Sequence, residues 1–591
     1  GLSNMAYSSC FYVAMYLAAC LCMSTLTQGR IALGGAFTPN MVLQRDHPGL
    51  PPCRIFGLAF TNETVEISFE NSVDPSLDVP GPFSVMPMKT GWNHWIPPLD
   101  APWGNFSVNF TAPLHEGPYT ITVSSKQNMS DVTTLENVMF GEVFFCAGQS
   151  NMKLTIGATD DAALEYAHAV ALGDRMRINY VSGNLSLDGP QISPNNGNWT
   201  VGSGANGTAI KDFSAVCWDS GRNIAEWFKK TDPSNAPVVG LIEVSVGGTT
   251  IHHWIPDYIG VGCNKTGLLP SKGECVQYPP GWIYDGRMNS MLLEGHGVSV
   301  RSVLYYQGEA DSGENDHYSQ AAYECELRGL VTSYRQAFGQ PTLPVFIIQL
   351  PGIKGTTSAQ HDNDTSLGTP AAEGWQAIQL AQQDVGLHTP GVGLVMVPDF
   401  GCCGLHYGHK YPVGERAANI TRQMVYGDKT IDNTYPMFAS VDRGDNGVIN
   451  IHIVNGSGLH LKPTYSCEKK NTIVTGVTDV VNATCCSSMP SGHEGIGIVK
   501  FGISTSKKPR HYWGGWIPAD LKIVSDSLLT ATAFIPPEVN ITSIDMVDIN
   551  FGGVGCTLAN SNGMPLGFVP PQTIPAKTRS SPSPPSPPPS P

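Results

Sequence analysis

The pentapeptide at residues 148–152, GQSNM, places Ser150 directly behind a continuous apolar run at residues 143–147. A serine hydroxyl is a poor nucleophile that needs an adjacent base and exposure at a tight turn between a strand and a helix. The Gly-x-Ser-x-Gly elbow, which is typical of α/β-hydrolases, is absent here. Taken alone, the pentapeptide does not distinguish a nucleophile from a serine in a surface turn.

Two further segments with suitable chemistry also follow apolar runs. Gly247 and Gly248 come after the run 238–242, and consecutive glycine N–H groups can face a developing oxyanion. Gln307 and Glu309 come after the run 303–306. The Gln307 amide can donate to an oxyanion, and the Glu309 carboxylate can orient a neighbour or bind substrate hydroxyls. Each segment alone is equally compatible with an ordinary loop.

A histidine follows the last of these runs, at residues 392–397. His406 is a candidate general base, and Asp399 is the candidate carboxylate that fixes its tautomer. Position alone leaves three other histidines as competitors, namely His252, His253 and His409.

The elements that must position these residues form an α/β pattern. The apolar runs, with a fifth at residues 345–348, lack alternation, and helical patterns lie between them at residues 220–230, 317–337 and 374–385. Buried strands separated by helices predict a doubly wound parallel sheet with helices on both faces. Ligands bind beyond the carboxyl ends of such strands, where all four candidate segments lie.

Alternating apolar residues on both sides of this region predict flanking β-rich domains. We predict five segments: a signal peptide, an N-terminal β-domain, a catalytic domain, a C-terminal β-rich region and a disordered Pro/Ser-rich tail. Their ranges are 1–29, 30–137, 138–427, 428–572 and 573–591.

In this order, the four segments resemble the sialate O-acetylesterase family of the SGNH-hydrolase superfamily. The family's blocks read close to GQSNM, WGGT and WYQGE, and its last block carries an Asp, a His and a downstream Lys. Asp399, His406 and Lys410 match that last block. Further similarity lies at residues 41–45, 213–218 and 556–565, so that the resemblance covers roughly residues 30–572.

The resemblance implies an SGNH-type catalytic domain and a serine esterase that removes acetyl groups from carbohydrate. It implies Ser150 as the nucleophile and His406 as the base. The N–H groups of Ser150 and Gly248 and the Gln307 side chain would form the oxyanion hole. It calls for no metal and no cofactor.

The acid partner of His406 stays open. Superfamily members often place it three residues before the histidine, where this chain has Cys403. Asp399 lies seven residues before and is our prediction; a Ser-His dyad helped by a backbone carbonyl or by Glu309 is the alternative. We expect Glu309 and Asn151 to bind substrate or to orient the other groups.

Two other departures from the family concern the substrate. Val246 stands where the family usually has Trp, and Tyr407 stands where Pro usually follows the His. Both are expected to adjoin the substrate pocket, so they leave open which O-acetylated sugar is bound. The alternatives are an acetylesterase of wall polysaccharide such as xylan or pectin, and an inactive carbohydrate-binding wall glycoprotein on the same scaffold.

Composition and charge exclude some partners. There are 34 Lys and Arg against 49 Asp and Glu, a net charge of −15, and no basic run interleaved with aromatics. We therefore expect no nucleic-acid partner and no membrane association once the signal is cleaved.

Several features predict export to the extracellular space or to the lumen of the secretory and lysosomal pathway. Residues 9–27 are apolar and uncharged, which is typical of a signal peptide, with a membrane anchor as the alternative. The Pro-rich tail resembles wall-glycoprotein linkers and suggests association with an extracellular matrix. Sequons for N-glycosylation begin at Asn62, Asn105, Asn109, Asn128, Asn184, Asn198, Asn206, Asn264, Asn363, Asn419, Asn455, Asn482 and Asn540.

Cysteine usage also fits an oxidising compartment. Twelve of the fifteen cysteines lie outside the predicted signal. An even number in an exported chain favours disulfides over a metal site. The adjacent pairs Cys402-Cys403 and Cys485-Cys486 lack the spacing of zinc ligands.

Overall fold

The structure is a computed structural model that describes most of the chain between residues 31 and 573. The described residues are 31–34, 36–77, 79–88, 103–181, 197–264, 281–284, 298–312, 319–351, 370–400, 405–445, 448–463, 498–500, 516–533, 546–549, 556–567 and 569–573. The predicted signal segment lies outside them, as does the tail beyond residue 573.

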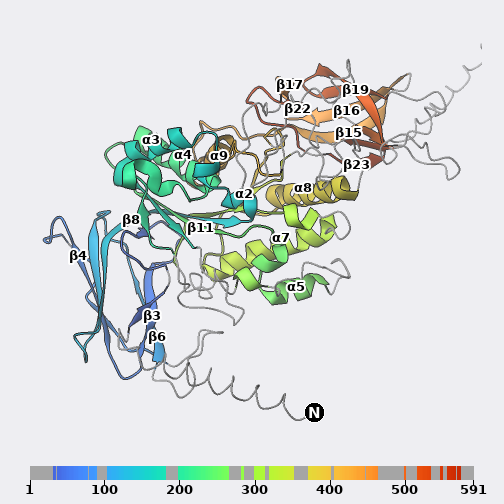
Figure 1. Ribbon diagram of the computed structural model, residues 1–591. Coiled ribbons are helices and arrows are strands. Elements are labelled where there is room, and N and C mark those ends of the chain that lie inside the picture. The colour runs from blue at the N-terminus through green and yellow to red at the C-terminus, as the bar shows by residue number, and fades with distance from the viewer. Residues whose placement is uncertain are drawn as a thin grey trace, which may run out of the picture.

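The N-terminal region is a pair of facing antiparallel sheets (Figure 1). One contains β1 (Ala32–Leu33), β3 (Cys53–Phe60) and β6 (Trp103–Phe110), and the other contains β5 (Phe83–Val85), β4 (Val65–Asn71), β7 (Tyr119–Ser125) and the start of β8 (Val132–Gly148). Buried residues alternate along β4 and β7, as the sequence predicts. Phe69 of β4 and Phe110 of β6 pack with ring centroids 4.9 Å apart, which joins the two sheets.

Strand β8 connects this region to the next. Its first residues pair with β7, and its second half lies between two parallel neighbours, β11 and β12. The short strand β2 (Val42–Gln44) pairs with the middle of β8. Every residue from Val138 to Gly148 is buried. The predicted domain boundary at residues 137/138 therefore falls inside a continuous strand.

The central sheet has the order β10-β9-β11-β8-β12-β13-β14. Its remaining strands are β9 (Met176–Tyr180), β10 (Thr200–Val201), β11 (Val239–Ser245), β12 (Ser302–Tyr306), β13 (Val345–Ile348) and β14 (Val392–Val395). All are parallel except β10, which is antiparallel to β9 at the edge. Five of the six parallel strands coincide with the apolar runs that predicted them, and β9 was not predicted.

Helices cover both faces of this sheet, so the predicted doubly wound α/β fold is confirmed (Figure 1). On one face lie α3 (Ala162–Leu172), α4 (Ala215–Thr231) and α9 (Tyr411–Tyr426); on the other lie α5 (Asp257–Asn264), α7 (Gln320–Ala337) and α8 (Pro370–His388). The short helix α2 (Ser150–Lys153) follows β8. Short 3₁₀ turns are η1 (Ile156–Ala158), η2 (Gly173–Arg175), η3 (Gly204–Ile210), η4 (Ile251–Trp254) and η7 (Glu309–Ser312). No described helix is both long and apolar enough to span a bilayer.

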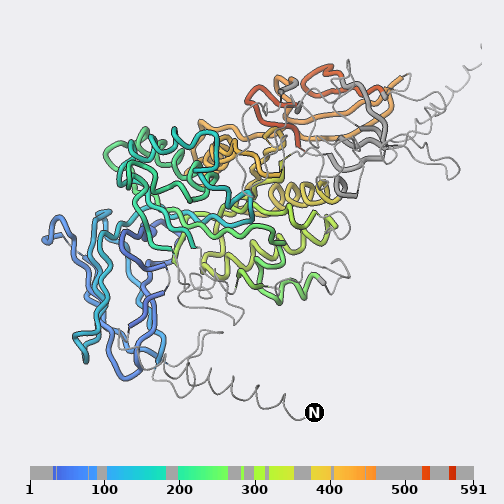
Figure 2. Tube along the Cα trace, in the orientation of Figure 1, coloured from blue at the N-terminus to red at the C-terminus, as the bar shows by residue number. Residues whose placement is uncertain are grey.

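The C-terminal region is β-rich, as predicted, and lies beside the central domain in Figure 2. One sheet contains β15 (Met437–Arg443), β16 (Val448–Val454), β20 (Leu528–Ala533), β19 (Trp516–Ser525), β18 (Ile498–Lys500), β21 (Met546–Ile549) and β23 (Val569–Thr573), and a second pairs β17 (His460–Pro463) with β22 (Cys556–Ala559). Tyr435 and Met564 pack against Leu394 and Met396, at the end of β14.

Two disulfides brace the central domain. Cys146–Cys217 joins β8 to α4, and Cys263–Cys325 joins α5 to α7. The preference for disulfides is confirmed for these four residues, whereas Cys53 is a buried thiol that donates to the Gln44 carbonyl. The pairs Cys402-Cys403 and Cys485-Cys486 lie outside the described residues.

A buried carboxylate in β8 joins the N-terminal and central regions. Glu142 is 0% exposed, and its Oε1 lies 2.6 Å from Arg45 Nε and 2.7 Å from His47 Nε2. Arg301 Nε lies 3.7 Å from Oε2. Burial by itself would raise the Glu142 pKa, but the His47 hydrogen bond and the two arginine charges hold it at about 2.

We predict that Glu142→Gln lowers the melting temperature at pH 7. Breaking a buried ion pair costs about 3–5 kcal/mol, and we expect about 2 here because Arg45 keeps partial contact with water. Because the folded pKa lies below the unfolded one, the stabilisation is present above about pH 4.5 and is lost as the pH falls towards 2. Melting curves between pH 7 and 2 should therefore drop less steeply for the variant. Glu66→Gln, which removes an exposed pair with Lys126, is the control, and equal melting temperatures for both variants would contradict the prediction.

Candidate active site

Ser150 lies at the turn between β8 and α2, and its side chain is partly exposed. Only glycine fits at position 148 in this turn, since a Cβ there would lie 2.0 Å from the Tyr306 carbonyl oxygen of the neighbouring strand. The backbone at Gly148 also has a positive φ of 153°, which side-chain-bearing residues rarely adopt. The hydroxyl therefore has the position at the carboxyl end of a central strand that a nucleophile requires.

His406 lies against this serine. Its Nε2 is 2.7 Å from Ser150 Oγ, across 256 residues of sequence. Burial and the charge of Lys410 lower the pKa of His406, which favours the neutral imidazole that can accept a proton. The structure thus brings together the predicted nucleophile and the predicted base.

The three competing histidines have other neighbours. His252 Nδ1 lies 3.0 Å from Glu326, and His253 Nδ1 contacts the Thr250 hydroxyl at 3.2 Å. His409 Nδ1 lies 3.6 Å from an Asp161 oxygen.

The glycine loop after β11 faces the serine. A Cβ on Gly247 would lie 3.6 Å from Ser150 Cβ, and the Val246 N–H donates to the Gly148 carbonyl at 3.0 Å. Gly248 has φ +71°, which aims its peptide in a direction that other residues disfavour. Ser150 opens α2, and the first N–H groups of a helix have no partner within the helix. This geometry suits an oxyanion hole made from backbone N–H groups.

Gln307 has a different environment from the predicted one. Its side chain is 0% exposed, and its Nε2 donates to Gln149 Oε1, the Thr249 carbonyl and Asp311. Tyr323 donates to its Oε1 at 3.0 Å. The amide's donors are already used inside the protein, so Gln307 fastens the glycine loop to β12, and its predicted place in the oxyanion hole gains no support.

Asn151, Glu309 and Lys410 form a buried group beneath Ser150. Asn151 is 0% exposed; its Nδ2 donates to Glu309 Oε1 at 2.5 Å and to the Leu405 carbonyl at 2.9 Å. Lys410 Nζ donates to Asn151 Oδ1 at 2.6 Å. Of the two predicted roles, the burial of Asn151 and Glu309 fits orientation better than contact with substrate.

Tyr407 also belongs to this buried layer. It is 3% exposed, and its hydroxyl lies 3.0 Å from that of Tyr306. Tyr407, in the usual proline position, packs inward over the Lys410 ammonium, and its burial does not support the expected place at the substrate pocket. Val246 is only partly buried and lies beside the glycine loop.

Asp399 is 1% exposed and forms a two-pronged ion pair with Arg416 of α9, at 2.6 and 2.7 Å. Arg416 also donates to the Met396 carbonyl at 2.7 Å, so the pair ties the end of β14 to α9. Burial by itself would lower the pKa of Arg416, but the negative charge of Asp399 outweighs it and raises that pKa. Both carboxylate oxygens of Asp399 are engaged by Arg416, so its predicted role as the acid partner of His406 gains no support.

Some residues of the site were not found from the sequence. Arg416 carried no motif, and Gln149 and Tyr306 lie inside the first and third motifs but were given no role. Pro412 in the first turn of α9 and the left-handed cap Gly427 were a usable signal for that helix. No cluster of three potential metal ligands occurs among the residues that the structure describes.

The sequons fall into three groups. Asn62, Asn109, Asn198, Asn206 and Asn455 are exposed, and Asn128 and Asn419 are partly exposed. Asn105 is 5% exposed inside β6, so a glycan there is incompatible with the folded strand. The side chains of Asn184, Asn264, Asn363, Asn482 and Asn540 lie outside the described part of the chain.

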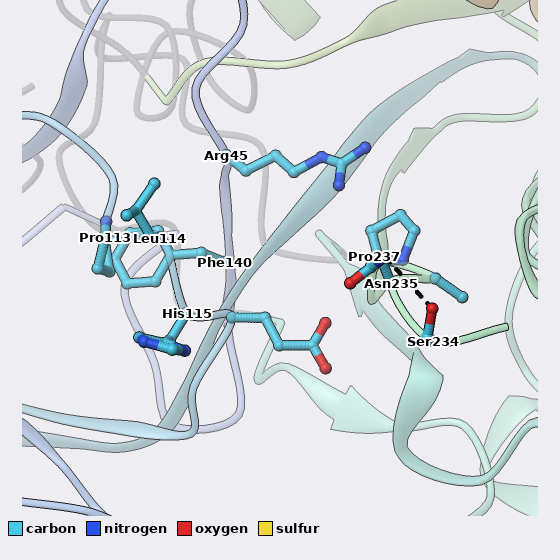
Figure 3. Close-up of a pocket in the computed structure, with 10 residues that line it drawn as sticks. Arg45, Pro113, Leu114, His115, Phe140, Ser234, Asn235 and Pro237 are labelled. Atoms are coloured by element: carbon cyan, nitrogen blue, oxygen red, sulfur yellow. Dashed lines mark hydrogen bonds between the residues drawn. The ribbon is translucent and has the colours of Figure 1, made fainter. Parts of the chain in front are cut away.

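A separate pocket of about 310 Å³ lies at the junction of the N-terminal and central regions (Figure 3). It is lined by Arg45, residues 113–116, Phe140 and residues 234–237. Residues 234–237 precede β11, whereas the glycine loop follows it. The pocket is therefore at the opposite edge of the sheet from Ser150.

The geometry can be compared with known proteins. Residues 140–396 match the sequence profile of the family described as "Carbohydrate esterase, sialic acid-specific acetylesterase". The sialate O-acetylesterases of Homo sapiens and Pongo abelii are each 26% identical over 312 residues, 51% of this chain and 52% of those proteins. That of Mus musculus is 22% identical over 460 residues, 70% of this chain and 76% of the relative. The chain thus spans about half the length of the human and orang-utan relatives.

A solved structure has the same fold. The crystal structure of a carbohydrate acetylesterase from Xanthomonas citri aligns with a TM-score of 0.62 at 19% identity, covering 91% of this chain and 99% of that one. Residues 140–396 are therefore similar in sequence to the carbohydrate esterase family of sialic acid-specific acetylesterases, and the fold agrees with that of a carbohydrate acetylesterase.

Proposed function

We propose that this protein is a serine esterase that hydrolyses O-acetyl esters on carbohydrate. The observation that carries the proposal is the 2.7 Å contact between Ser150 Oγ and His406 Nε2 at the carboxyl edge of the sheet. The match of residues 140–396 to the profile of a sialic acid-specific acetylesterase family supports acetyl ester hydrolysis. An inactive binding protein would have no need for an imidazole with a lowered pKa against a partly exposed serine.

The reaction proceeds by two acyl transfers. His406 accepts the Ser150 proton while Oγ attacks the acetyl carbonyl, and the Ser150 and Gly248 N–H groups stabilise the oxyanion. The C–O bond to the sugar breaks, and His406 returns the proton to the leaving alkoxide. Water, deprotonated by His406, then attacks the carbonyl of the acetyl-serine; the bond from this carbon to Oγ breaks, His406 returns the proton to Ser150, and acetate leaves. One oxyanion donor is typically worth about 10²–10³-fold in rate.

The substrate class is an O-acetylated sugar. A sialoside is the first candidate because of the similarity to sialic acid-specific acetylesterases, and acetylated wall polysaccharide such as xylan or pectin is the second. Val246, in place of the usual Trp beside Ser150, favours a pocket with a different shape from that of the relatives. The two disulfides support a secreted or lumenal location, because such bonds persist in oxidising compartments.

We expect Ser150→Ala to lower acetate release at least 10³-fold, because the acyl acceptor is lost. Acetate should be measured from O-acetylated sialosides, acetylated xylan and acetylated pectin, and a fluorophosphonate probe should label the wild type but not the variant. Ser234→Ala, an exposed serine at the opposite edge of the sheet, is the control. A wild type that neither takes up the probe nor releases acetate from any of these substrates would sink the proposal.

The pH profile reports on His406. Only neutral imidazole accepts the serine proton, and the pKa of His406 is lowered by burial and by Lys410. The acidic limb of kcat/KM for 4-nitrophenyl acetate should therefore have its midpoint below the ordinary imidazole value of about 6.5. A midpoint at or above that value would show that burial and Lys410 do not lower the pKa of His406.

Asp399→Asn separates two roles of the carboxylate. If Asp399 mainly anchors Arg416, the melting temperature falls, as expected for loss of about 3–5 kcal/mol, and kcat per folded molecule stays within about tenfold. A triad acid would instead lower kcat about 10⁴-fold. We expect the first result, measured by thermal melts and active-site titration. Asp428→Asn, which breaks the Arg422 pair on the same helix, serves as the control.

A further inference from the structure

Lys410 is a cation with no exposure to water. Its side chain is 0% exposed, and its Nζ lies 3.4 Å from the centre of the Tyr407 ring and 5.5 Å from that of Tyr306. A lysine is almost never fully buried unless it is paired. The nearby carboxylate is Glu309, which is linked to the ammonium through the Asn151 amide. The ammonium is thus tied to Asn151, the residue that follows Ser150 in the chain.

Both the oxygen and the nitrogen of the Asn151 amide are hydrogen-bonded. Its carbonyl oxygen accepts from Lys410, and its two N–H bonds point to Glu309 and to the Leu405 carbonyl. Leu405 precedes His406, and Asn151 follows Ser150. One amide, fixed at both ends by charged groups, therefore joins the peptide that carries the base to the residue after the nucleophile.

We propose that Lys410, Asn151 and Glu309 form a positioning chain that holds His406 at hydrogen-bonding distance from Ser150. The proposal rests on the esterase function above and assigns the three residues no contact with substrate. Lys410 orients the Asn151 amide, because an ammonium can only donate and so requires the carbonyl oxygen to face it. Asn151 Nδ2 must then face Glu309 and Leu405. Without the lysine, the amide can rotate and release the Leu405 carbonyl.

The charges in this layer also act on the imidazole. Lys410 acts on the imidazole itself. The other groups of the layer are Glu309 of η7, Tyr306 and the Asp399–Arg416 pair, all of which surround Tyr407. Burial lowers the Lys410 pKa well below its ordinary value, with Glu309 opposing the shift. Burial raises the Glu309 pKa to about 7, against the Asn151 hydrogen bond and the Lys410 charge. Since Lys410 lowers the pKa of His406, its removal should raise it.

The test compares Lys410→Met and Asn151→Asp with wild type on 4-nitrophenyl acetate. Methionine removes the donor and the charge. Aspartate keeps an acceptor for Lys410 and nearly the same shape, but it cannot donate to the Leu405 carbonyl. We expect kcat to fall about 10- to 100-fold in both, because small misplacements of catalytic groups cost about this much, with KM within twofold. The acidic limb of the profile should move to higher pH in Lys410→Met. Lys230→Met, an exposed lysine on α4, is the matched control.

The outcomes separate the two proposals. An inactive wild type overturns both. An active wild type with both variants within twofold in kcat overturns the positioning chain alone. If circular dichroism shows that Lys410→Met does not fold, the Asn151→Asp variant decides. A rise in KM with an unchanged kcat would show that the chain acts on substrate binding, and it would overturn the positioning role.

Discussion

Strand β8 has hydrogen-bonded neighbours on both edges and buried side chains on both faces from Val138 onward, and this constraint organises the rest of the molecule. A strand in that setting cannot shift its register without exposing apolar residues on both faces. Its end at Gly148 is therefore fixed relative to β11 and β12. The turn to Ser150 inherits that rigidity, and so does the contact with a histidine 256 residues away.

The same strand explains why the N-terminal region cannot be regarded as an independent module. The backbone passes from one sheet to the other without a linker. Glu142 also forms ion pairs with Arg45, in the segment after β2, and with Arg301, just before β12. A carboxylate buried among such partners is stable only while they stay in place. The N-terminal sheets thus contribute to the rigidity of β8 at one end, while Ser150 and His406 meet at the other.

Buried charges recur around the site in a regular way. Asp399 and Arg416 tie β14 to α9, and Glu309 and Lys410 meet through Asn151. Both sets lie beside residues 405–407, which carry His406 and belong to no helix or strand. A loop can hold a base accurately only if other groups fix it, and directional charged hydrogen bonds do so better than apolar contacts.

The order of residues predicted the parallel sheet, the β-rich flanks and the pairing of Ser150 with His406. Uninterrupted apolar runs suit strands buried on both faces, and the motifs that resemble the family identify the loops at the ends of those strands. Three-dimensional packing was needed to show that Gln307 and Tyr407 face inward, that Asn105 is buried, and that Asp399 pairs with Arg416. These outcomes depend on which side chains meet across long sequence separations. Burial and hydrogen-bond partners are properties of that packing, and no local pattern of residues encodes them.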